Sequence, residues 1–309
     1  MHIRTLFFAA AILGMLLPAG ESLARTSGNA RFGYDSQLLG ASIDGKWVSC
    51  EDLQENDAYH LYRIWGGHAV SLYGSEGYRG EGVMGAIHAD HPDEFANEIP
   101  GSYIYTVHTE AGAIGDDGPA LLAVNFLDSE RSWDPMPRSA KSLGTANPAY
   151  RSAVKDYLAS AGLPDADPDI MQIFRVDLEG DGADEVLICA QNIVKGGCDF
   201  ISWQPDKPLS SGTGTPGLAK AGSYSVVLLR KVSGNSVVTI PLDLTLITDV
   251  EKAETTVPCL HKIYCFADLN GDGVMEILTA SDYYEGAFIN VFEVKNTQVK
   301  AVLTGGFGV

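Results

Sequence analysis

Apolar and polar positions in the C-terminal half follow the same order twice. An apolar segment leads into an acidic loop, a second apolar segment follows, and a later pair of apolar segments flanks a tight turn, at residues 233–235 in the first copy and 295–297 in the second. Short β-rich segments between turn residues predict strands. We therefore expect two blade-like units of four antiparallel strands, one over 170–242 and the other over 261–304.

Four short antiparallel strands are also what one blade of a β-propeller contains. The sequence thus predicts a mainly β protein, a β-propeller-like array of four-stranded antiparallel units. One segment departs from this pattern: within 147–161, Tyr150, Val154, Leu158 and Ala161 fall at helical spacing, and a Gly–Leu–Pro stop follows. This helix suggests a boundary near residue 145, which could separate two domains or cross one β architecture.

The sequence divides into three regions, of which the two before residue 146 lack the repeat. Residues 25–145 form an N-terminal β-rich region with a hairpin expected over 60–73 and strands over 102–108 and 120–126. Residues 146–309 form the repeat region. Residues 1–24 have the pattern of a signal peptide: a positive charge at Arg4, a twelve-residue apolar stretch over 6–17 and a small-x-small cleavage pattern ending at Ala24.

The apolar stretch of this leader is shorter than the roughly 20 residues that cross a bilayer. The sequence therefore predicts an exported protein, periplasmic or extracellular, with no membrane span after cleavage. Forty acidic residues against 21 basic ones give a net charge of −19. Such a surface repels nucleic acids and anionic lipids and attracts cations, so it argues against the first two as partners.

The acidic loops carry the strongest chemical signal. Alternate residues of a tightly curled loop can direct their oxygen atoms to a common centre, and hard cations such as calcium bind several oxygen ligands at about 2.3–2.6 Å. Each loop offers side chains at positions 1, 3, 5 and 9 and a backbone carbonyl at position 7. The expected ligands are Asp177, Glu179, Asp181, Ala183 (carbonyl) and Glu185 in the first loop and Asp268, Asn270, Asp272, Val274 (carbonyl) and Glu276 in the second.

Crowded carboxylates repel one another unless a cation lies between them, which is the physical reason for expecting two calcium sites. The competing interpretation is a solvated acidic turn, because Asp and Gly are common turn residues. An EF-hand is excluded, because its position 12 needs a bidentate Glu and helices on both sides. Ile188 and Thr279 stand at that position here, between β-rich segments.

The loops with their flanking segments resemble the FG-GAP, or VCBS-type, repeats of integrin-like β-propellers, whose calcium loops read Asp-x-Asp-x-Asp-Gly-x-x-Asp. The resemblance covers residues 170–304. Residues 45–47 and 59–63 in addition resemble N-terminal segments of secreted bacterial proteins that carry such loops. The resemblance of the loops implies a calcium-stabilised fold and a binding or adhesive role. This chain departs from the pattern at Glu179, which is longer than Asp, at the neutral Asn270, and at the final Glu of both loops.

Five cysteines leave two interpretations open. In an oxidising compartment, the simplest disulfide candidates are the local pairs Cys189–Cys198 and Cys259–Cys265; alternatively, several of the five are small buried apolar residues. No nucleophile signature surrounds any of them.

The sequence thus favours an exported, non-catalytic calcium-binding protein that meets an unidentified protein or glycan. Its alternatives are a secreted hydrolase in which the repeats are a scaffold, and a structural protein of the cell envelope.

Overall fold

The structure is a computed structural model and describes residues 30–34, 37–50, 52, 68–74, 77–89, 103–109, 112–114, 122–127, 133–193, 220–283 and 286–308. Within these ranges the protein is mainly β, with antiparallel sheets and two helices. The candidate signal peptide, Cys198 and the first half of the expected hairpin over 60–73 lie outside them. Neither described helix has the length and apolar character needed to span a membrane.

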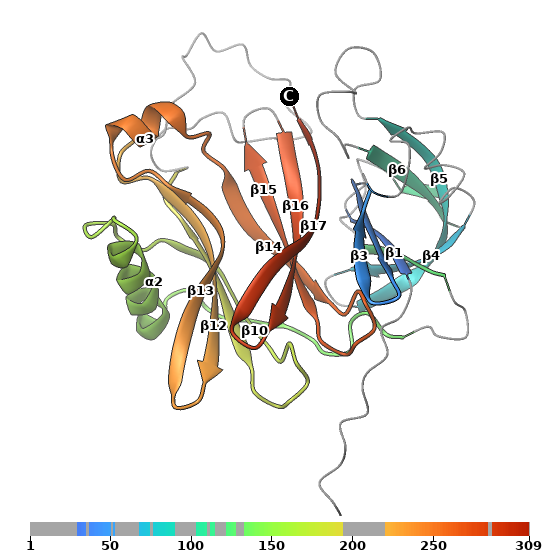
Figure 1. Ribbon diagram of the computed structural model, residues 1–309, viewed down its shortest axis with the longest axis horizontal. Helices are drawn as coiled ribbons and strands as arrows, with labels where there is room; N and C mark the ends of the chain where they lie inside the picture. The colour runs from blue at the N-terminus through green and yellow to red at the C-terminus, as the bar shows by residue number, and fades with distance from the viewer. Residues whose placement is uncertain are drawn as a thin grey trace, which may run out of the picture.

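The predicted mainly β character is confirmed, and the C-terminal half forms two antiparallel sheets, one of five strands and one of four (Figure 1). The first contains β10 (Ile170–Val176), β11 (Glu185–Gln191), β12 (Tyr224–Ser233) and β13 (Ser236–Leu246), with the short β9 (Lys141–Ser142) added beside β10. The second contains β14 (Leu260–Ala267), β15 (Glu276–Tyr283), β16 (Gly286–Lys295) and β17 (Gln298–Gly308). In both units consecutive strands are hydrogen-bonded neighbours.

The N-terminal strands form one larger sheet, in the order β3-β2-β1-β8-β4-β5-β6-β7. Its strands are β1 (Ala30–Tyr34), β2 (Gln37–Ile43), β3 (Lys46–Ser49), β4 (Ala69–Gly74), β5 (Gly77–Ala89), β6 (Tyr103–Thr109), β7 (Gly112–Ile114) and β8 (Leu122–Phe126). The expected strands over 68–73, 102–108 and 120–126 correspond to β4, β6 and β8. No propeller or closed sheet is identified in the described part of the chain.

The predicted helix is confirmed as α2 (Pro148–Ser160). Asn147 caps its N-terminus by accepting a hydrogen bond from the backbone N–H of Ala149, and Pro148 provides a fixed φ at the first helical position. A second helix, α3 (Val250–Thr255), was not expected from the sequence; the Asp249 side chain caps it by accepting from the N–H of Lys252. Helix α2 covers the outer face of the first unit, and Val154 and Leu158 on it are fully buried (Figure 1).

The sheets stack as layers, with the second unit between the first unit and the N-terminal sheet (Figure 1). Alternate residues of β11 point to opposite faces: Leu187 and Cys189 pack against the second unit, whereas Ile188 and Ala190 pack beneath α2. Such two-sided burial explains why these strands read as continuous apolar runs.

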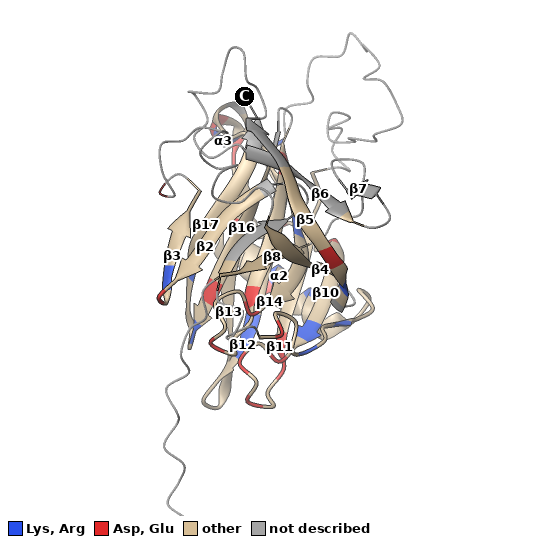
Figure 2. Cartoon of the chain, turned by 90° about the vertical axis from the view of Figure 1, so that its right-hand side faces the viewer, with Lys and Arg blue, Asp and Glu red and all other residues tan. Residues whose placement is uncertain are grey.

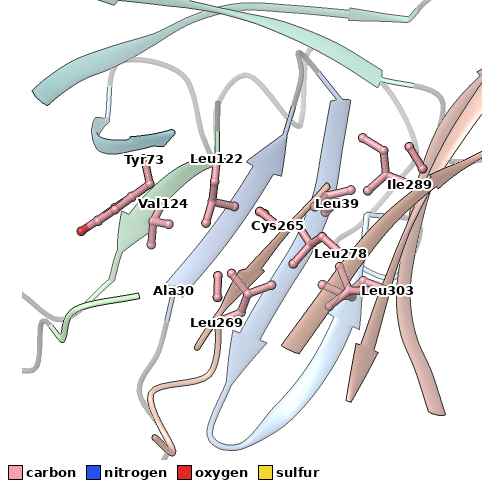
Figure 3. Close-up of a cluster of buried hydrophobic side chains, with 13 residues drawn as sticks. Ala30, Leu39, Tyr73, Leu122, Val124, Cys265, Leu269, Leu278, Ile289 and Leu303 are labelled. Carbon is pink, nitrogen blue, oxygen red and sulfur yellow. The ribbon is translucent and has the colours of Figure 1, made fainter. Parts of the chain in front are cut away.

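The second unit buries its other face against the N-terminal sheet. Leu278, Ile289 and Leu303 of that unit share one hydrophobic cluster with Leu39 and Val124 of the sheet (Figure 3). The boundary near residue 145 therefore lies within a continuous stack of layers, which agrees with one β architecture crossed by a helix.

Gly40 and Gly305 allow β2 and β17 to approach each other closely. A Cβ atom on Gly305 would lie 2.6 Å from the carbonyl oxygen of Leu38, and one on Gly40 would lie 2.9 Å from a methyl group of Leu303. Gly40 also has φ = 143°, which side chains disfavour.

Candidate metal centre

The two acidic loops occupy equivalent places and touch each other. Each connects the first and second strands of its unit, β10 to β11 and β14 to β15, and the final Glu of each loop is the first residue of the second strand. The N–H of Met275 donates to the carbonyl oxygen of Leu178 (2.8 Å), so the loops lie side by side. Figure 2 shows Asp and Glu gathered around this end of the sheets, near β11 to β14.

The first loop is curled by its own aspartates. The carboxylate of Asp177 accepts hydrogen bonds from the N–H groups of Gly180 (2.6 Å), Asp181 (3.1 Å) and Gly182 (3.0 Å). Gly180 and Gly182 both have positive φ, 71° and 86°, which glycine adopts without steric cost. Asp181 in turn accepts from the N–H of Ala183 (2.8 Å).

The second loop repeats this backbone. The Asp268 carboxylate accepts from Gly271 (2.7 Å) and Gly273 (2.8 Å), whose φ angles are 73° and 82°. Asp272 accepts from the N–H of Val274 (2.8 Å), as Asp181 does from Ala183. Asn270 accepts from the N–H of Asp272 (2.9 Å). The sequence repeat is thus a repeat of loop conformation.

Each loop is also tied to the strand that follows it. One carboxylate oxygen of Glu185 accepts from the N–H of Leu178 (3.0 Å), and one of Glu276 accepts from the N–H of Leu269 (2.8 Å). Both leucines are fully buried in the apolar clusters between the layers. The position-9 glutamates are 3% and 1% exposed, so the other oxygen of each must find its partner inside the protein.

In the first loop that partner is a lysine. The ammonium group of Lys231 on β12 contacts Glu185 (3.1 Å) and forms a closer ion pair with Glu179. Burial alone would lower the pKa of Lys231, but the two glutamates outweigh it and raise the pKa. Burial likewise acts to raise the pKa of Asp177, yet its backbone N–H donors and Arg138 lower it overall. The charges of the first loop are therefore compensated within the protein.

In the second loop the corresponding oxygen has no partner. Oε1 of Glu276 is buried and makes no hydrogen bond. Burial raises the pKa of Glu276 well above its ordinary value, and the nearby carboxylates of Asp268, Asp272 and Glu293 act in the same direction. Burial, with a contribution from Asp272, raises the pKa of Asp268 to about 6. The carboxylates of Asp268, Asp272 and Glu276 are therefore crowded, and Oε1 of Glu276 is buried without a hydrogen-bond partner among the described residues.

The linker 133–147, which precedes α2, forms hydrogen bonds with both loops through Trp133 and Arg138. The sequence did not indicate this contact. The indole N–H of Trp133 donates to the carbonyl oxygen of Asp268 (2.7 Å). The guanidinium of Arg138 donates to the carbonyl oxygens of Asp177 (2.6 Å), Leu178 (2.8 Å) and Gly273 (2.9 Å), and so bridges the two loops. A lone Trp and a lone Arg in a polar stretch carry no periodic pattern by which they could have been recognised.

The expected ligands of each loop lie within one curled segment, and the two loops differ in how their final glutamates are partnered. In the described part of the chain, no three His, Cys, Asp or Glu side chains already converge as a metal site would require. The donor set of the second loop nevertheless fits a hard cation, because Glu276 presents an unsatisfied carboxylate oxygen to a loop containing two aspartates and an asparagine. In the first loop, Glu179 and Glu185 are engaged by Lys231. The roles of the Ala183 and Val274 carbonyls stay predictions.

The disulfide candidate Cys259–Cys265 is wrong. Both residues are free thiols. Cys265 lies on β14 and Cys259 just precedes it, so six residues of extended chain, about 20 Å at 3.3 Å per residue, separate them, whereas bridged Cα atoms lie within about 7 Å. Cys189 is a buried free thiol whose S–H donates to the carbonyl oxygen of His261 (3.0 Å). The alternative interpretation, small buried residues, fits Cys189 and Cys265.

A hydrogen-bonded Ser–His pair is buried between the two units. Nδ1 of His261 lies 2.7 Å from the hydroxyl of Ser281, and Nε2 lies 3.1 Å from the hydroxyl of Thr245. His261 is 3% exposed and Ser281 is 0% exposed, so a substrate has no access to this hydroxyl group. The Ser–His contact links β14 and β15 within the second unit, and the contact of His261 with Thr245 links β14 to β13 of the first unit. The pair lends no support to the hydrolase alternative.

We expect His261 to make the protein acid-sensitive. Burial lowers its pKa in the folded state, although the carboxylates of Asp243 and Asp282 oppose this shift. The unfolded chain, with a histidine pKa near 6.5, therefore binds a proton more readily than the folded chain. Neutral His261 therefore contributes to the free energy of unfolding above about pH 6.5, and this contribution is lost as the pH falls below that value.

The measurement is the melting temperature between pH 7.5 and 5 for the parent protein and for His261→Gln, both in chelator. The parent should lose more stability on acidification than the variant, which cannot titrate at this position. Equal pH profiles would contradict the assignment of this sensitivity to His261.

The fold and the loops define a mainly antiparallel β protein with two linked acidic loops. No family model matches the chain, and no curated protein or solved structure shows a significant match to it.

Proposed function

We propose that this is an exported calcium-binding protein of blade-like β units, non-catalytic, in which calcium in the loop 268–276 stabilises the junction between the layers. One observation carries the calcium assignment: the buried, unpartnered Oε1 of Glu276 beside Asp268 and Asp272. Calcium fits because it takes six to eight oxygen ligands, and this loop offers carboxylates, an amide and backbone carbonyls. The signal-peptide pattern supports export, and the resemblance to FG-GAP repeats supports the propeller-like arrangement and the binding or adhesive role.

The ion would act as a structural staple. The loop 268–276 contacts the first loop through Met275 and the linker through Trp133 and Pro135, whose carbonyl oxygen accepts from the N–H of Asp268 (2.7 Å). A cation there would neutralise the crowded carboxylates and fix a loop on which these elements converge. The role of the cation would therefore be to stabilise the fold, and a binding partner would contact another part of the surface.

Calcium is expected to raise the melting temperature of the protein. With about 1 mM free calcium and a dissociation constant near 0.1 mM, in the range of extracellular calcium modules, one site adds about 1.4 kcal/mol to the free energy of unfolding. For a chain of 309 residues, that corresponds to a rise of about 2 °C. Calorimetry in calcium, in magnesium and in chelator measures this shift.

Glu276→Gln is the matched variant for this experiment. It keeps the shape of the side chain but removes the buried charge, so we expect it to lose the calcium response while being at least as stable as the parent in chelator. Glu185→Gln, at the same place in the first loop, should keep the response. A parent protein whose melting temperature does not change with calcium would disprove the proposal.

A further inference from the structure

The two units share a backbone but differ in charge at one strand position. Lys231 lies two residues before the end of β12, and Glu293 lies two residues before the end of β16. In the register of the sheets, Val186 pairs with Arg230 and Ile277 with Phe292. One residue further, Lys231 stands opposite Glu185, whereas Glu293 stands opposite Glu276. The first unit therefore has a cross-strand ion pair where the second has two like charges, an arrangement that destabilises a sheet.

Lys231, on β12, supplies a positive charge to the first loop. Its side chain is only 8% exposed, and its ammonium group contacts two predicted metal ligands, Glu179 at position 3 and Glu185 at position 9. Two of the four carboxylates predicted to bind an ion in the first loop thus already share a covalently attached positive group. A calcium ion could enter only by displacing a buried ammonium group from its carboxylates.

In the second unit, the position that corresponds to Lys231 is occupied by Glu293. Glu293 has other partners: its Oε1 accepts from the indole N–H of Trp47 (3.2 Å) and forms an ion pair with Lys295 (3.0 Å). The Lys295 side chain is 67% exposed and makes this contact at the surface. The buried Oε1 of Glu276 is left without a donor, and Glu293 adds negative charge nearby.

We infer that Lys231 replaces the metal ion in the first loop and that the protein binds one calcium ion, in the second loop. The inference rests on the proposed calcium binding and corrects the expectation of two equivalent sites. It also makes Lys231 and Glu293 the residues that decide which loop needs an ion.

Counting bound calcium by isothermal titration calorimetry tests the inference on the full chain. The parent should bind one ion, Glu276→Gln none, and Glu185→Gln one. No binding by the parent would disprove the proposed function itself. Two ions per parent chain, or loss of binding in Glu185→Gln rather than in Glu276→Gln, would leave calcium binding intact and overturn the assignment to one loop.

Replacing the lysine supplies the second arm. Lys231→Gln should lower the melting temperature in chelator, because Glu185 is then buried without a cation, and calcium should restore part of that loss by occupying the first loop. The count should rise from one ion per chain to two, while Lys231→Arg should stay at one. A folded Lys231→Gln variant that still binds one ion would overturn the role of Lys231; if it does not fold, the Glu185 and Glu276 variants decide.

Discussion

Replacing Arg138 by methionine is expected to reduce the free energy of unfolding by about 3 kcal/mol. The guanidinium makes three hydrogen bonds to backbone carbonyls of the two acidic loops, and bonds to a charged donor are worth about 1.5–3 kcal/mol each without being additive. Methionine keeps most of the side-chain length but leaves the carbonyl oxygens of Asp177 and Gly273 without this donor. Denaturant unfolding in chelator, which removes any contribution of bound calcium, measures the loss.

Arg230→Met is the control for this substitution. Arg230 is also half-buried, but its guanidinium makes one hydrogen bond to a side chain, to the hydroxyl of Thr239 (3.0 Å). Its replacement should cost about 1 kcal/mol or less. Similar losses in the two variants would show that Arg138 does not bridge the loops as the hydrogen bonds indicate.

Shortening Leu269 to alanine is expected to cost about 2–5 kcal/mol, the range for removing a buried leucine side chain. Leu269 is fully buried in the cluster between the second unit and the N-terminal sheet, and its N–H holds Glu276 in place. The substitution therefore creates a cavity at the point where the candidate calcium loop is anchored to the core. Equilibrium unfolding in urea gives the change in free energy.

Leu244→Ala provides the comparison. Leu244 lies on β13 and is 41% exposed, so its truncation should change stability by only about 0.5 kcal/mol. If Leu269→Ala reduced the free energy of unfolding by no more than Leu244→Ala, Leu269 would not anchor the loop to the core.

Much of the C-terminal half could be predicted from its sequence because each unit depends on local signals. Turn residues separate the strands, the acidic loop marks the connection between the first two, and Asn147 with Pro148 marks the start of α2. The second copy supports each assignment made in the first. The N-terminal sheet has no such repeat, and its order, in which β1 pairs with β8 and β4 also pairs with β8, depends on contacts between distant segments.

The sequence could not predict that Glu185 has a buried cationic partner whereas Oε1 of Glu276 has no partner among the described residues. This difference also depends on contacts between separate strands. The loop sequences themselves are nearly equivalent, and the group that distinguishes them comes from the third strand of each unit. Lys231 follows Arg230 near the end of β12, and only the register with β11 places it opposite Glu185. The predicted disulfide Cys259–Cys265 was wrong because residues six positions apart along an extended strand are far apart in space.

The close approach of β2 and β17 has a consequence for how the protein is made. The backbone at Leu38 meets Gly305, so residues near opposite ends of the chain complete one interface. A chain emerging from the ribosome cannot form this interface until Gly305 has been synthesised, and contacts so far apart in sequence form slowly. Until then the N-terminal sheet keeps an uncovered apolar face, which exposes it to association with other chains.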